Sequence, residues 1–228
     1  MNPWILLDRV TIVGERSELL LYRRENEFSI RIARRGELMN SRDHASEDAL
    51  AELACRRLVG RDRPRLLIGG LGMGFTLAAA LRALGEGAEV LVAELVPAVV
   101  AWNRGPLGEQ AGFPLADSRV AVREIDVACI LQSQQGAFDA ILLDVDNGPE
   151  GLTSEANDWL YGADGLSAAY SALSPGGVLA VWSAGPDQSF NARLRKIGFD
   201  VEEVVVRSRG SKGRRYVIWL AERKADRG

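Results

Sequence analysis

Short apolar runs alternate with amphipathic segments along most of the chain. From position 65 onward the pattern predicts strands at 66–68, 90–93, 120–122, 138–143 and 178–182, and helices at 76–84, 97–103, 127–131, 166–173 and 190–197. Apolar strands that alternate with helices favour a parallel sheet with helices on both faces. Two adjacent β-prone runs close the chain, at 201–206 and 216–220, and predict one antiparallel edge strand. The predicted fold class is therefore α/β, with a doubly wound, mainly parallel, seven-stranded sheet.

The first 36 residues have a different pattern. They carry β-prone runs at 4–7, 10–13, 19–22 and 28–32, separated by polar turns. The last of these runs alternates apolar and polar side chains, as a half-buried strand does. We predict a small N-terminal β-hairpin or meander over 1–36 and an α/β domain over 37–228, which begins with a helix at 45–58.

Composition narrows the function classes. The 228 residues carry a net charge of −3, which argues against a nucleic-acid partner, and no apolar run approaches the ~18 residues of a membrane span. Cys55 and Cys129 form no disulfide framework, and His44 is the single histidine, so we expect no metal site built on several such ligands. The N-terminus lacks the charged and apolar regions of a signal peptide. We expect a cytoplasmic protein.

A glycine-rich loop is the strongest local signal. Gly69, Gly70, Gly72 and Gly74 directly follow a predicted strand and precede a helix. Glycines let the backbone turn tightly and approach a ligand closely, and the helix N-terminus beside them offers unpaired amides. The loop is thus a candidate nucleotide-binding site, although a closely packed strand–helix turn would need the same residues.

Three acidic residues follow the neighbouring strands. Glu94 stands 20 residues after Gly74, where an acid would accept hydrogen bonds from ribose hydroxyls. Asp126 could contact an adenine edge or simply cap a helix, and Asp144 ends the fourth strand. The carboxyl ends of parallel strands form one edge, where ligands bind in open α/β sheets. Convergence of the loop and the three acids on that edge predicts an adenosyl-ligand site.

The order of these motifs resembles a known family. The loop lacks the Gly-x-Gly-x-x-Gly spacing of hydride-transferring enzymes and is more similar to that of S-adenosylmethionine-dependent methyltransferases. Residues 37–200 resemble the spermidine synthases (aminopropyltransferases), which carry a glycine loop, an acid after strand two and an Asp-x-x-Asp after strand four. Here these are residues 69–74, Glu94 and the segment 144–149, while 41–47 matches the family's Tyr-His-Glu segment. The resemblance implies S-adenosylmethionine, or its decarboxylated form, as the donor.

The departures from the family pattern concern its acids. The loop acid that anchors the donor's amino group falls on Gly72, and the second acid after strand four falls on Asn147, with Asp146 one position away. The family histidine is displaced to His44. By resemblance, His44, Asp146 and Asn147 are expected to bind substrate, and Asp144 is the expected general base.

The resulting prediction is a spermidine synthase-like transferase. It would transfer a methyl or aminopropyl group to a small nucleophile, an amine, without a metal, and would react weakly with putrescine because the usual acids are reduced. The alternatives are a non-catalytic adenosyl-binding protein and a true spermidine synthase in which Asp146 or Glu150 substitutes for the missing acid. The sequence leaves the oligomeric state open, with a homodimer as one alternative.

Overall fold

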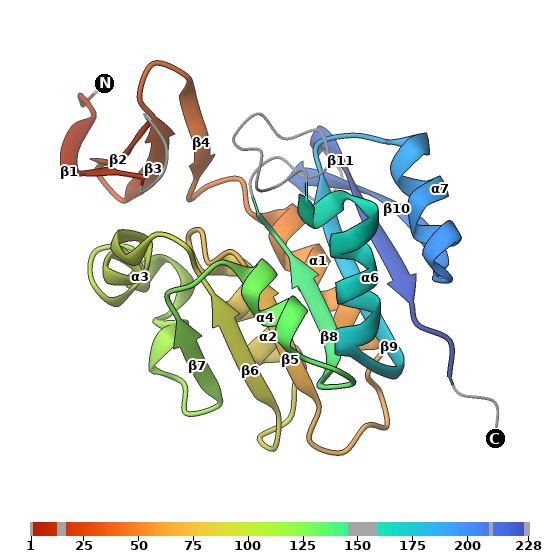
Figure 1. Ribbon diagram of the computed structural model, residues 1–228. Coiled ribbons are helices and arrows are strands. Elements are labelled where there is room, and N and C mark those ends of the chain that lie inside the picture. Colours follow the sequence, from red (N-terminus) through yellow and green to blue (C-terminus); the bar gives the residue numbers. More distant parts are fainter. Residues whose placement is uncertain (1, 13–16, 146–158, 210–211, 226–228) are drawn as a thin grey trace.

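The computed structural model describes residues 2–12, 17–145, 159–209 and 212–225. Its strands form a four-stranded and a seven-stranded sheet, and the smaller sheet packs beside one end of the larger one (Figure 1). Within the described residues no helix is both long and apolar enough to span a membrane.

The larger sheet has the predicted α/β topology. Its strand order is β10-β11-β9-β8-β5-β6-β7. The strands are β5 (Arg65–Gly69), β6 (Glu89–Ala93), β7 (Val120–Arg123), β8 (Phe138–Leu143), β9 (Leu173–Ser183), β10 (Asp200–Arg209) and β11 (Lys212–Glu222). The neighbours from β7 to β9 pair in parallel. The apolar runs of the central strands β5 and β8 are buried on both sides, as is typical of parallel strands.

The antiparallel strand was predicted at the edge of the sheet, and this position is wrong. β11 is antiparallel to both β9 and β10 and lies between them, so β10 forms the edge. The turn between the last two strands makes them neighbours, but it does not determine which of them pairs with β9. β11 takes that inner place, and its segment from Val217 to Ala221 is buried.

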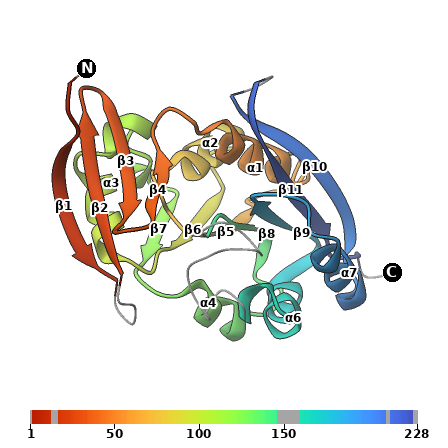
Figure 2. The ribbon, with the colours of Figure 1, turned by 90° about the horizontal axis from the view of Figure 1, so that it is seen from above.

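Helices cover both faces of the sheet (Figure 2). They are α1 (Ala45–Arg56), α2 (Phe75–Ala83), α3 (Pro97–Arg104), α4 (Val127–Ser133), α6 (Ala163–Ala172) and α7 (Gln188–Ile197), with 3-10 turns at Gly108–Ala111 and Pro114–Ala116. α1 packs on α2, and α4 and α7 each pack on α6 on the other face. Two buried apolar clusters form the contacts between these helices and the sheet.

A bulged segment lies between the positions predicted as a helix at 166–173 and a strand at 178–182. The segment belongs to β9, although Phe138 pairs with Leu173 and Ala140 with Val178, which leaves extra residues on the β9 side. The backbone of Arg223 exchanges hydrogen bonds with Gly176 and Gly177 at 3.0 and 2.8 Å. These ladder bonds keep the proline-glycine segment within the sheet.

The N-terminal sheet is an antiparallel meander of β1 (Ile5–Thr11), β2 (Glu18–Arg24), β3 (Glu27–Ile32) and β4 (Gly36–Asn40). The runs predicted at 4–7 and 10–13 fall on the single irregular strand β1, with position 13 outside the described residues, and β4 extends the sheet four residues beyond position 36. One face of β2 and β3 joins the first apolar cluster. The Trp102 Nε1 on α3 also donates a hydrogen bond to the Asp8 carboxylate on β1 at 2.7 Å. These contacts hold the small sheet over the loops at the edge of the large one.

Candidate active site at the carboxyl edge of the sheet

The glycine loop connects β5 to α2 and lies against the end of β8. Gly70 has a φ of +87°, and a Cβ there would lie 2.4 Å from the carbonyl oxygen of Asp144. Its backbone N–H donates to the carbonyl oxygen of Ala93 at 2.9 Å. Position 70 therefore requires glycine because protein backbone approaches it closely. The packing explanation of the loop holds for this residue, whatever ligand binds beside it.

Glu94 follows β6 and fixes the loop. Its two carboxylate oxygens accept hydrogen bonds from the backbone N–H groups of Leu71 and Val96, each at 2.8 Å. The residue is buried, with 8% of its surface exposed. An ionised carboxylate has about four acceptor positions, so these bonds are compatible with a further donor. Glu94 thus has a structural role in addition to the ribose-binding role predicted for it.

Asp126 follows β7 and caps α4. Its Oδ1 accepts a hydrogen bond from the backbone N–H of Ala128 at 2.9 Å, which is the ordinary N-cap interaction. The same residue, with its neighbours Ile125 and Val127, lines the cavity described below. Capping and contact with a ligand are therefore compatible at this position.

Asp144 directly follows β8 and is partly buried. Its Oδ2 accepts a hydrogen bond from Thr76 Oγ1 on α2 at 2.7 Å. Burial raises the pKa of the Asp144 carboxyl, and the Thr76 bond opposes that shift. A carboxyl group with a raised pKa is a stronger proton acceptor than an ordinary aspartate.

A second carboxyl group lies near Asp144. Glu47, in the first turn of α1, accepts a hydrogen bond from Ser46 Oγ at 2.5 Å. Burial raises the pKa of Glu47 to about 7, and the charge of Asp144 contributes to the rise. Burial also raises the pKa of Tyr216 on β11, with Glu47 as one of the nearby charges, and the Tyr216 ring lies 4.8 Å from that of Trp182. Acids and aromatic rings thus meet where α1 begins.

His44 is the N-cap residue of α1 and contacts Phe75 on α2 and Asp48 on its own helix. Its ring stacks on that of Phe75 with centroids 4.1 Å apart, and its Nδ1 is 2.8 Å from the Asp48 carboxylate. The side chain is 38% exposed. Substrate binding by His44 stays a prediction.

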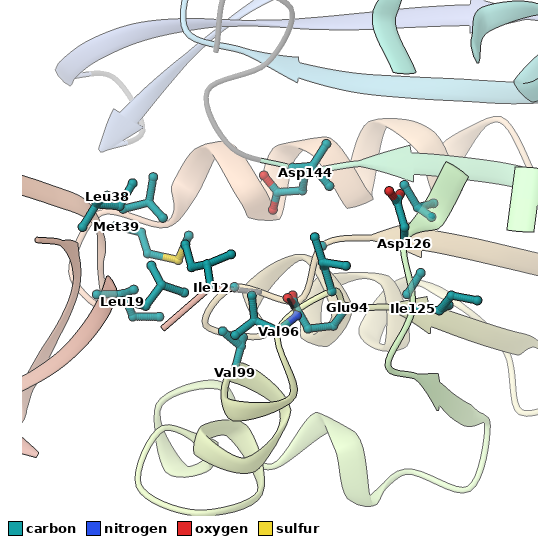
Figure 3. Close-up of a pocket in the computed structure, with 18 of the residues that line it drawn as sticks. Ile12, Leu19, Leu38, Met39, Glu94, Val96, Val99, Ile125, Asp126 and Asp144 are labelled. Carbon is teal, nitrogen blue, oxygen red and sulfur yellow. Dashed lines mark hydrogen bonds between the residues drawn. The ribbon is translucent and has the colours of Figure 1, made fainter. Parts of the chain in front are cut away.

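A cavity of about 150 Å³ joins several of the predicted site residues (Figure 3). Gly70, Gly72, Glu94, Asp126 and Asp144 line it. Three other predicted residues are not part of the cavity lining: Gly69, Gly74 and His44. Asp146 and Asn147 lie outside the described residues. Among those described, no cluster of three His, Cys, Asp or Glu side chains could hold a metal ion.

The other end of the cavity is formed by the N-terminal sheet. Six side chains line what we call the sheet compartment: Ile12, Leu19, Ile30, Ile32, Leu38 and Met39. A Cβ at Gly72 would lie 3.2 Å from Met39 Sδ, so Met39 occupies the space beside the glycine loop. Every member of this set is aliphatic or a thioether.

Sequence reasoning missed Thr76, the pairing of Glu47 with Asp144, and the compartment. Glu47 belongs to the segment at 41–47 that resembles the family's Tyr-His-Glu segment, which is the signal that could have identified it. Thr76 follows the loop by two residues, on the first turn of α2. The sheet compartment has no local sequence signal, because its residues face the glycine loop only when the small sheet packs over that loop.

Comparison with known proteins supports this architecture. No family model and no curated protein matches the chain. The spermidine synthase structure from Thermotoga maritima is 17% identical with a TM-score of 0.75, covering 97% of this chain and 74% of that one. A spermidine synthase in complex with the transition-state analogue AdoDATO is 16% identical with a TM-score of 0.74, covering 97% and 73%. An O-methyltransferase family protein from Burkholderia thailandensis is 17% identical with a TM-score of 0.57, covering 81% and 57%. The chain therefore has a spermidine synthase-like form of the methyltransferase fold.

Proposed function

We propose that the protein is a transferase that takes a methyl or aminopropyl group from an S-adenosyl donor and passes it to a small amine. The observation that carries this proposal is the common cavity of Gly70, Gly72, Glu94, Asp126 and Asp144. These residues come from four different strand ends, and ligands of open α/β sheets bind at that edge. The fold shared with spermidine synthases and an O-methyltransferase family protein supports the same class of reaction.

The cavity residues fit an adenosyl group in the order of the strands. Asp126 and Ile125 form one end of the cavity, where an adenine ring would lie between an apolar wall and a polar acceptor. Glu94 comes next, with carboxylate oxygens that can accept from ribose hydroxyls. The 5′ side of the ribose would then lie beside Gly72 and Asp144. The donor would be S-adenosylmethionine or its decarboxylated form.

Asp144 would act as the general base. When bound, the sulfonium donor supplies an electrophilic carbon whose bond to sulfur breaks as the amine nitrogen attacks. Asp144 would accept the proton that the amine loses, and its raised pKa suits that task. Thr76 Oγ1 holds the carboxylate through one oxygen, which leaves the other for the nucleophile. Correct positioning supplies much of the rate in such a reaction.

Ligand binding and a screen for transfer test the proposal. Calorimetry with S-adenosylmethionine and methylthioadenosine should show binding that weakens in Glu94→Gln. Glu89→Gln is a matched control, because Glu89 stands at the opposite end of β6 with an exposed side chain. Labelled donor and a panel of amines then test turnover. A wild type that binds no adenosyl compound would refute the proposal, and tight binding without any transfer would favour a non-catalytic adenosyl-binding protein.

A true spermidine synthase is the second candidate, and Glu47 favours it. A diammonium substrate needs carboxylate partners because a buried, unpaired ammonium group is strongly penalised. Glu47 places a second carboxyl group near Asp144, while Asp146 and Glu150 lie outside the described residues. Our leading proposal expects weak or absent turnover of putrescine with the decarboxylated donor. Turnover near the ~10 s⁻¹ typical of enzymes would establish the second candidate instead.

A further inference from the structure

The two ends of the cavity differ in chemistry. Among the described residues, the charged side chains that line the cavity are Glu94, Asp126 and Asp144, all at strand ends of the large sheet. The sheet compartment, at the other end, is aliphatic apart from the thioether of Met39 (Figure 3). A charged group placed there would lose its hydration without gaining a partner, whereas an alkyl group would be stabilised.

The sheet compartment lies where the 5′ substituent of an adenosyl ligand would be. Asp126 lies at one end of the cavity, Glu94 lies between, and the N-terminal sheet closes the other end. A nucleoside with its base near Asp126 and its ribose near Glu94 directs its 5′ substituent toward Gly72 and Met39. Met39 lies against Gly72, and its flexible, polarisable side chain can adapt to groups of different size.

We propose that the sheet compartment binds an uncharged aliphatic substituent on the 5′ sulfur of the adenosyl ligand. The inference rests on the adenosyl site of the proposed function and adds the chemical class of the group beyond it. A charged arm on the same sulfur would lie on the other side, toward Asp144 and Glu47, whose carboxyl groups suit an ammonium. The division would let one sulfur present a neutral alkyl arm and a charged arm to two different environments.

Three 5′-deoxyadenosine thioethers test the proposal without requiring any activity: the methylthio, butylthio and 3-aminopropylthio compounds. The butyl and aminopropyl chains have the same number of heavy atoms and differ in charge. Burial of each added methylene should tighten binding up to about fourfold. Titration calorimetry of the wild type should therefore show butylthioadenosine binding about tenfold or more tighter than methylthioadenosine.

Variants of Met39 locate the effect. Met39→Glu should weaken butylthioadenosine binding about tenfold while weakening the aminopropyl compound much less, and Met39→Leu, which conserves volume, should keep the wild-type pattern. Ile5→Glu is the control, because Ile5 is 61% exposed on the same small sheet and should leave all three affinities unchanged. Thermal melting checks that each variant is folded.

The outcomes separate this proposal from the proposed function. Methylthioadenosine that binds with an affinity sensitive to Glu94→Gln, but with no gain from the longer alkyl chain, would overturn the compartment and leave the adenosyl site intact. Equal weakening of all three compounds by Met39→Glu would also overturn it. Failure of every compound to bind would overturn the adenosyl site and this inference together.

Discussion

Two carboxylates, Glu94 and Asp144, follow strands on either side of β5 in the same sheet and have different surroundings. Glu94, after β6, accepts hydrogen bonds from two backbone N–H groups and holds the glycine loop. Asp144, after β8, accepts a bond from one hydroxyl, and burial raises the pKa of its carboxyl group. We therefore propose different tasks for two residues that were predicted by the same argument: Glu94 would hold a ligand, and Asp144 would accept a proton.

The largest expected effect comes from removing the charge of Asp144. Asp144→Asn keeps the size of the side chain and removes the base, which typically lowers a rate 10²- to 10⁴-fold. Adenosyl binding should change little, because Glu94 and the glycine loop are untouched. Single-turnover kinetics and calorimetry measure the two effects separately. Full turnover in the variant would place the base elsewhere, with His44 as the next candidate.

Glu47→Gln tests whether a second carboxyl group with a raised pKa lies near Asp144. The pKa of Glu47 is raised from 4.5 to about 7, so the folded protein binds this proton more tightly than the unfolded chain does. Stability is therefore lost as pH rises between these values. The free energy of unfolding of the variant should exceed that of the wild type by up to about 3 kcal/mol at pH 8, and the two should differ little at pH 4. Urea unfolding at both pH values measures the difference.

The control for that measurement lies on the same helix. Glu52 is on α1 with an exposed side chain, so Glu52→Gln should show no comparable dependence on pH. A stability change in Glu47→Gln that is the same at pH 4 and pH 8 would contradict the carboxyl pair.

Glu94→Gln should weaken binding and leave chemistry intact. Glutamine retains one acceptor oxygen but loses the charge, and hydrogen bonds to charged groups are the stronger ones. We expect nucleoside affinity to fall by about 1–2 kcal/mol, with the rate at saturating donor nearly unchanged. A variant with normal affinity and a greatly reduced rate would reverse the roles assigned to Glu94 and Asp144.

Thr76→Val gives the smallest effect and sharpens the role of Asp144. Valine has nearly the same shape and removes the hydroxyl that donates to Oδ2. That hydrogen bond lowers the pKa of Asp144, so its loss should move the acidic limb of the pH–rate profile to higher pH. Stability should change by about 1 kcal/mol. An unmoved profile would mean that Asp144 does not set it.

Sequence reasoning reached the parts of the site that parallel-sheet geometry determines. Strand ends meet at one edge, so the acids at 94, 126 and 144 could be placed together, and the structure has them on one cavity. The fold class was predictable for the same reason, since alternating strands and helices leave few topologies. The order of β10 and β11 was not predictable, because a hairpin pattern is the same in either order.

The missed features depend on contacts between distant segments. Glu47 approaches Asp144 because α1 packs across the end of β8, and the compartment around Met39 exists because the small sheet packs on α3 and the loop. Neither contact has a periodic pattern in the sequence. Asp126 is a different case, because its position was predicted correctly but its role was not decided. A helix cap and a ligand contact need the same residue at this position, so the sequence alone does not distinguish the two roles.

A crystal structure of the protein soaked with 5′-methylthioadenosine tests the central claim most directly. We predict density for the ribose at the Glu94 carboxylate, for the adenine ring between Ile125 and Asp126, and for the sulfur and its methyl group between Asp144 and Met39. Density for the nucleoside outside this cavity, or with its base in the sheet compartment, would contradict the account.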